Sequence, residues 1–119
     1  MKTTVFVAGE FEAAHQLDNY DGPCRNLHGH SYKVQVGYSG DIGPDGMVVD
    51  MSVVRSLLEA VLSTLDHTYL NTHPRLDHTT AEAIAHYIWG ELESALPADL
   101  EVVRVWETAK GWVEVCRTL

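Results

Sequence analysis

Two histidines separated by a single glycine, His28 and His30, carry the strongest chemical signal in this sequence. They directly precede the alternating apolar residues of 32–38, a pattern typical of a β-strand. Side chains two positions apart on a strand lie on the same face, so both imidazoles can reach one metal ion. A third histidine, His15, ends another strand-like run over residues 3–15. If these two strands pair, the three imidazoles meet.

Three histidines suit a catalytic zinc ion, which keeps its fourth coordination position for water or substrate. We therefore expect His15, His28 and His30 to bind Zn²⁺. Histidine sites also take iron, nickel or cobalt, so the sequence leaves open which metal is used in the cell. The alternative is three separate solvated or core histidines, and their spacing favours the metal site.

The two cysteines of the chain are Cys24, four residues before His28, and Cys116, in an alternating run near the end. The sequence shows no signal peptide, so we expect reduced thiols rather than a disulfide. Cys24 is then a potential thiolate beside the metal site, or alternatively a small packed loop residue.

Size and charge restrict the classes of protein that this chain can represent. Its 119 residues fit one domain, which we expect to span residues 1–119. Eight basic and seventeen acidic residues give a net charge of −9, which argues against nucleic acid as the main partner. No apolar stretch is long enough to span a bilayer, so we expect no membrane partner and a cytoplasmic location.

The elements that must position these residues follow from hydrophobic periodicity. Asp50 and Thr80 are suitable N-caps for two helices, each with an apolar stripe at helical spacing. Alternation predicts four strands, over about residues 3–15, 30–39, 100–107 and 112–117.

The resulting order is β-β-α-α-β-β. It predicts an α+β fold in which two helices cover one face of a four-stranded antiparallel sheet. Such a sheet has two free edges, and association edge to edge into a ring would remove them, so we expect a homo-oligomer.

Six short segments bring the chain close to a known family. They are residues 11–15, 24–31, 49–50 and 65–71, Thr80 with Glu82, and residues 106–108. In these segments the sequence resembles the 6-pyruvoyl-tetrahydropterin synthase superfamily, most closely its bacterial 6-carboxy-5,6,7,8-tetrahydropterin synthase branch. Each segment is weak alone, but together they span nearly the whole chain in the family's order.

The resemblance implies a tunnelling fold whose subunits form a barrel, with pterin sites between chains and a trimer-based assembly such as a hexamer. It implies zinc-dependent conversion of 7,8-dihydroneopterin triphosphate to 6-carboxy-5,6,7,8-tetrahydropterin, with release of acetaldehyde and triphosphate. The product would enter 7-deazapurine synthesis, for queuosine or a related compound.

The resemblance also assigns roles to individual residues. The three histidines bind zinc, and Cys24 is the general base that takes a proton from the substrate side chain. Asp66 and His67 form a second proton-transfer unit, although a histidine after a helix also suits the helix dipole. Glu107 anchors the pterin through paired hydrogen bonds, unless it is a solvent-facing acid. Thr80 is a weaker pterin contact, because a helix cap explains it equally well.

Several alternatives stay open. The three residues between Cys24 and His28 match the bacterial branch, whereas the animal pyruvoyl enzymes typically have five. The closest rival is therefore a 6-pyruvoyl-tetrahydropterin synthase, which eliminates triphosphate without cleaving the side chain. Ala81 departs from the family, which carries a hydroxyl residue there. More distant rivals are a cupin-like metal protein and a catalytically silent metal-binding or pterin-binding oligomer.

Overall fold

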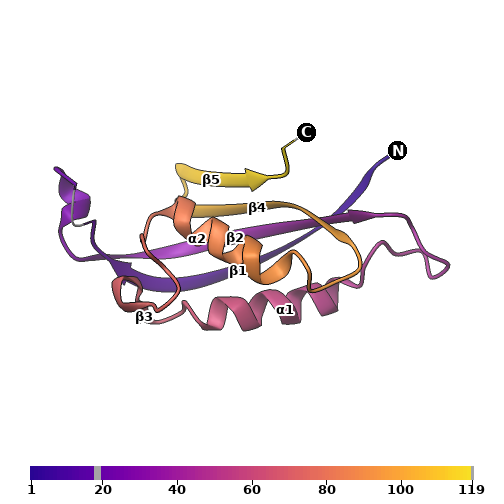
Figure 1. The fold of residues 1–119 in the computed structure, drawn as a ribbon, viewed down its shortest axis with the longest axis horizontal. Helices are drawn as coiled ribbons and strands as arrows, with labels where there is room; N and C mark the ends of the chain where they lie inside the picture. The colour runs from indigo at the N-terminus through magenta and orange to yellow at the C-terminus, as the bar shows by residue number, and fades with distance from the viewer. Residues whose placement is uncertain (18–19, 119) are drawn as a thin grey trace.

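The structure is a computed structural model that describes residues 1–17 and 20–118. Five strands form one sheet in the order β3-β1-β2-β4-β5, and two helices pack against it (Figure 1). The bounds of these elements are β1 Thr3–His15, β2 His28–Gly40, α1 Met51–Ser63, β3 Thr68–Tyr69, α2 Ala81–Leu92, β4 Asp99–Thr108 and β5 Gly111–Cys116. Short 3₁₀ turns cover Pro23–Arg25 and Leu70–Thr72.

The long hairpin of β1 and β2 is the centre of the sheet. The two strands pair antiparallel over their whole length, from Thr3 opposite Gly40 to His15 opposite His28. In β2 the even positions Tyr32, Val34 and Val36 are fully buried, and side chains of both helices join the same hydrophobic core. This alternation confirms a sheet that buries one face under two helices.

The strand count differs from the sequence-based prediction of four. The fifth strand, β3, has only two residues and pairs parallel to β1, with Thr68 opposite Ala13 and Tyr69 opposite Ala14. Two residues are too few to show an alternating pattern, so periodicity could not reveal this strand. The other four strands lie where they were predicted, to within two residues at each end.

Both predicted helix caps are confirmed. The Asp50 carboxylate accepts a hydrogen bond from the Ser52 backbone N–H, and the Thr80 hydroxyl accepts one from Ala83. Helix α1 ends at Ser63, so Asp66 and His67 lie beyond the helix, directly before β3. Capping therefore fixes where both helices begin. Asp66 is positioned instead by its contact with β1 at the edge of the sheet.

Helix α1 approaches the sheet very closely at Gly9 of β1. A Cβ atom at this position would lie 2.8 Å from Cδ1 of Leu62 and 3.3 Å from Cδ2 of Leu58. A side chain at this position would force the end of the Leu62 side chain to shift, so glycine allows the helix to pack this closely on the strand.

Two other expectations can be compared with the structure. Cys24 is half-buried and Cys116 is exposed, and both thiols are free, as expected. Neither helix of the described residues is long and apolar enough to cross a membrane.

Candidate metal centre and pterin site

The register of the central hairpin brings the three predicted metal ligands together. His15 lies directly opposite His28. His30 lies opposite Ala13, which is two residues before His15 and therefore on the same face of β1. Their candidate ligand nitrogens all lie within 4.8 Å of one another. His15 is buried and the other two are half-buried. The three histidines are therefore positioned to bind one metal ion.

Backbone carbonyls orient two of these imidazoles. Nδ1 of His15 lies 2.7 Å from the Thr79 carbonyl oxygen, and Nδ1 of His28 lies 2.6 Å from the Asn26 carbonyl oxygen. A carbonyl only accepts, so each Nδ1 carries the proton and each Nε2 presents a lone pair. This is the arrangement that fixes the tautomer of histidine ligands in metal sites.

The remaining ring nitrogens support the same interpretation. Nε2 of His28 and Nε2 of His30 are buried and have no hydrogen-bond partner among the described residues. A buried polar atom without a partner costs about 1–3 kcal/mol, and a metal ion in the cluster would compensate for it. The donor set and these unpaired nitrogens thus fit a tri-histidine metal site.

Electrostatics favour the neutral, metal-binding form of His30. Burial lowers the pKa of His30; the Glu107 carboxylate opposes this shift, and His15 and His28 add to it. Trp106 pairs with Lys33, three residues after His30 on β2, so the neighbouring Glu107 lies at the same end of the sheet as the metal cluster. Burial, and secondarily Glu107, also raises the pKa of the Tyr32 phenol, which therefore stays protonated.

Cys24 lies on the short turn Pro23–Arg25, just before β2. Its carbonyl accepts a hydrogen bond of 2.8 Å from the backbone N–H of Leu17, which ties the turn to the end of β1. Within the described part of the chain, the cluster of possible ligand atoms consists of the three histidines without the Cys24 sulfur. The structure thus leaves this thiol available for a role other than metal binding.

Asp66 and His67 touch each other and are both fixed to Glu12 of β1. Asp66 Oδ1 accepts a hydrogen bond of 2.9 Å from the Glu12 N–H, and Asp66 Oδ2 lies 2.9 Å from Nδ1 of His67. The backbone N–H of His67 donates to the Glu12 carbonyl at 2.6 Å. The backbone bond from Glu12, followed by the bond from His67, lowers the pKa of Asp66.

His67 adopts a left-handed backbone conformation with φ of 55°, which is uncommon for a residue other than glycine. Its side chain is 77% exposed, at the edge of the sheet where β3 ends the strand order. His67 and His30 both line a cavity of about 540 Å³, together with Glu12 and Ser31. The imidazole therefore faces an open space rather than the hydrophobic core.

Glu107 and Thr80, the two predicted substrate contacts, line one cavity of about 350 Å³, together with Leu17 and Trp112. Glu107 is half-buried near the end of β4. Thr80 precedes helix α2, and its hydroxyl is engaged in the helix cap. The structure thus places Glu107 and Thr80 on one cavity, and His67 on another cavity that the metal ligand His30 also lines.

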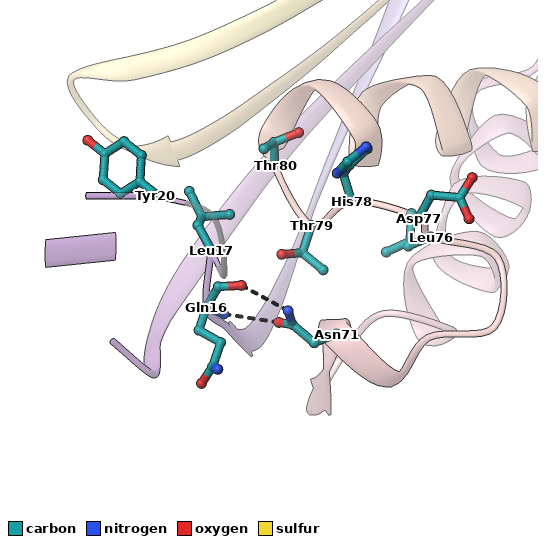
Figure 2. A pocket seen from close by; sticks show the side chains of 9 residues that line it. All are labelled: Gln16, Leu17, Tyr20, Asn71, Leu76, Asp77, His78, Thr79 and Thr80. Carbon is teal, nitrogen blue, oxygen red and sulfur yellow. Dashed lines mark hydrogen bonds between the residues drawn. The ribbon is translucent and has the colours of Figure 1, made fainter. Parts of the chain in front are cut away.

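A third cavity, of about 480 Å³, adjoins the Glu107 cavity through Leu17 and Thr80, which line both. Figure 2 shows how Asn71 closes one side by bonding the Gln16 backbone in both directions, at 3.0 and 2.8 Å. Thr79, whose carbonyl orients His15, also lines this cavity. Sequence reasoning gave no role to Thr79, because a backbone carbonyl carries no signal in residue type.

Comparison with known proteins shows the family of this chain. A sequence model of the 6-pyruvoyl tetrahydropterin synthase family matches residues 4–118. The chain belongs to that family. The family acts on pterin substrates, and the metal cluster and the Glu107 cavity are the features of this chain that fit such chemistry.

Individual relatives agree with this assignment. The chain is 44% identical to a 6-carboxy-5,6,7,8-tetrahydropterin synthase of Synechocystis, over 82% of this chain and 81% of the relative. It is 35% identical to the enzyme of that name from Haemophilus influenzae, over 87% and 92%. The structure of Caenorhabditis elegans 6-pyruvoyl tetrahydropterin synthase matches with a TM-score of 0.87 and 27% identity, covering 99% of this chain and 97% of that one.

The metal cluster predicts a specific loss of metal affinity in the variant His30→Ala. Removing one of three ligands should weaken Zn²⁺ binding by about 100-fold or more, since losing even an indirect partner of a ligand costs about 10–100-fold. Competition with a chromogenic chelator measures this affinity. The variant His86→Ala, at an exposed position of α2, is the control and should bind zinc normally. Equal zinc affinity in both variants would exclude His30 as a ligand.

The Asp66 contacts predict a pH-dependent contribution to stability. A lowered pKa in the folded protein means that the Asp66 carboxylate stabilises the fold above the ordinary aspartate pKa of about 3.9, and that this stabilisation is lost as the pH falls through the lowered value. The difference in free energy of unfolding between the natural protein and Asp66→Asn should therefore shrink from pH 7 towards pH 3 in urea titrations. The exposed Asp77, changed to Asn, serves as control. A difference that stays constant with pH would contradict this role of the charge.

Proposed function

We propose that this chain is a zinc-dependent 6-carboxy-5,6,7,8-tetrahydropterin synthase acting on 7,8-dihydroneopterin triphosphate, with acetaldehyde and triphosphate as the other products. The observation that carries the proposal is the tri-histidine cluster, with its two unpaired buried nitrogens, at the same end of the sheet as the carboxylate of Glu107. Three metal-binding histidines and a nearby carboxylate suit a pterin substrate, because a metal ion can hold the hydroxyls of its side chain and the carboxylate can bind its planar ring. The product would supply 7-deazapurine synthesis in the cytoplasm.

The metal would be held by His15, His28 and His30 and would supply Lewis acidity to the hydroxyls of the substrate side chain. The Glu107 carboxylate accepts the paired hydrogen bonds of the pterin N–H and amino groups and so orients the ring. Thr80, on the wall of the same cavity, is a secondary contact.

Proton transfer falls to the remaining residues. Cys24 acts as general base, drawing a proton from the side-chain carbon. His67 provides the second proton-transfer group, with Asp66 holding its Nδ1 at 2.9 Å so that Nε2 faces outward. This geometry resembles the carboxylate–histidine pair of other acid–base sites.

The position of His67 suggests that the working site lies between subunits. Strand β3 pairs only with Ala13 and Ala14, so residues 3–12 of β1 have no other strand on their outer edge within the described chain. Strand β5 is the opposite edge of the sheet. Pairing of these edges between copies would close a barrel and bring the exposed His67 to the site of a neighbour. We propose a trimer-based homo-oligomer on this ground.

Two considerations favour the carboxy product over the rival pyruvoyl product. The relative with 44% identity bears the carboxy-tetrahydropterin name, and only three residues separate Cys24 from His28. The rival reaction uses the same metal, base and anchor, so the static site is compatible with both. The product decides between them.

Turnover of 7,8-dihydroneopterin triphosphate by the zinc-loaded protein tests the proposal. We expect 6-carboxytetrahydropterin, identified by mass spectrometry, and acetaldehyde, trapped separately. Cys24→Ser should lose most of the turnover yet retain zinc, because the thiol lies outside the ligand cluster. Intact pyruvoyl product would assign the rival activity, and absence of turnover would refute the enzymatic proposal for this substrate.

The anchor role of Glu107 gives a separate prediction. Glu107→Gln replaces one acceptor by a donor, so KM should rise by about 10–100-fold, the range expected for lost hydrogen bonds to a charged group. Steady-state kinetics measure this change. Glu114→Gln is the matched control, because Glu114 pairs with Arg104 on the same hairpin at 2.6 Å. An unchanged KM in Glu107→Gln would remove Glu107 from substrate binding.

A further inference from the structure

Tyr32 has a buried hydroxyl that the folded chain does not use. The residue is 0% exposed, and its hydroxyl oxygen has no hydrogen-bond partner among the described residues. Tyr38, equally buried on the same strand, donates its hydroxyl to the Leu92 carbonyl at 3.0 Å. The fold thus satisfies one buried tyrosine and leaves the other unpaired. Phenylalanine would fill the Tyr32 position without that cost, so the hydroxyl calls for another explanation.

The register places Tyr32 beside the metal cluster, at the end of the sheet that also carries the proposed pterin anchor Glu107. Tyr32 follows His30 by two positions on β2 and so lies on the same face of the sheet. Lys33, the residue after Tyr32, pairs with Trp106, the residue before Glu107, so Tyr32 and Glu107 lie at the same end of these two paired strands.

Ring contacts hold the phenol in this place. Its ring stacks on Phe11 with centroids 4.6 Å apart and an interplanar angle of 7°. The rings of His30 and His15 lie edge-on to it, at 5.4 and 6.2 Å. A tyrosine packed on three sides in this way has little freedom to swing its hydroxyl towards solvent.

Three polar atoms in this region are therefore buried and unpaired, namely Nε2 of His28, Nε2 of His30 and the Tyr32 hydroxyl. The two nitrogens offer lone pairs, which a metal ion accepts. The phenol offers a hydrogen, which a metal ion cannot use and an oxygen atom can. The free protein thus carries a hydrogen-bond donor that awaits an acceptor from a bound ligand.

The chemistry of the pterin edge identifies that acceptor. If Glu107 accepts from the ring N–H and the adjacent amino group, the next polar atom along the edge is the ring carbonyl oxygen, which needs a donor. We propose that Tyr32 is a further binding residue of this site, and that its hydroxyl donates a hydrogen bond to the ring carbonyl oxygen of the pterin. The inference rests on the proposed function, because it takes the ligand to be a pterin.

Two tyrosine variants test the inference. Tyr32→Phe removes the unpaired hydroxyl, and Tyr38→Phe removes a satisfied one on the same strand as the matched control. The zinc-loaded proteins are titrated with two probes, 7,8-dihydroneopterin and pterin without a C6 side chain, and Kd is measured by calorimetry. Zinc content is measured in each variant, and thermal unfolding is followed without ligand.

We expect Tyr32→Phe to bind both probes about 10-fold more weakly than the natural protein, because the ring carbonyl loses its donor in a closed site. Its zinc content should be normal and its ligand-free Tm no lower than that of the natural protein. Tyr38→Phe should show a lower Tm and unchanged Kd values, since it leaves the Leu92 carbonyl without its donor.

Three results would overturn the inference. Natural Kd values for both probes in Tyr32→Phe would show that the hydroxyl makes no contact. A loss confined to 7,8-dihydroneopterin would move the contact from the ring to the side chain. A ligand-free Tm lowered as in Tyr38→Phe would make the hydroxyl structural. The test also separates the inference from the proposed function. If the natural protein binds neither probe, both fail. If the natural protein binds the probes and Tyr32→Phe binds them equally well, only the inference fails.

Discussion

The pairing of β1 with β2 is the constraint on which the rest of this structure depends. Both strands have thirteen residues, and they pair without interruption from end to end. Because side chains alternate along a strand, a slip of one residue would turn His28 and His30 to the face of the sheet that points away from the core. The same slip would expose Tyr32, Val34 and Val36. The hydrophobic core therefore fixes the register, and the register in turn assembles the metal ligands.

Register alone does not orient the imidazoles, and here the connections between elements contribute. The Thr79 carbonyl, just before helix α2, faces Nδ1 of His15 across a separation of 64 residues. The Asn26 carbonyl faces Nδ1 of His28 from the turn before β2. Since Thr80 caps α2, the start of that helix fixes both the Thr79 carbonyl and one wall of the Glu107 cavity. One local feature thus serves the metal centre and the cavity beside it.

At the edge of β1, hydrogen bonds hold His67 in an unfavourable backbone conformation while its side chain stays exposed. His67 holds a left-handed backbone conformation, which is unfavourable for a residue with a side chain, and two hydrogen bonds to the Glu12 backbone compensate, one from His67 itself and one through Asp66. The result is an imidazole whose Nδ1 contacts Asp66 and which remains largely exposed at the edge of the sheet. An exposed histidine held in this way is consistent with the proposal that His67 serves the site of a neighbouring subunit.

The sequence by itself determined the positions of the two helices, through Asp50 and Thr80, and of the four long strands, because caps and alternation are local signals. It also singled out His15, His28 and His30, since their spacing on two strands needed only a plausible pairing. The two-residue strand β3 stayed hidden, being too short for any period. Only the tertiary structure showed that Thr79 orients His15 and that the Tyr32 hydroxyl lies unpaired beside the metal cluster. These features depend on contacts between residues far apart in the chain, and neither residue type nor local spacing encodes which carbonyl or cavity a side chain will meet.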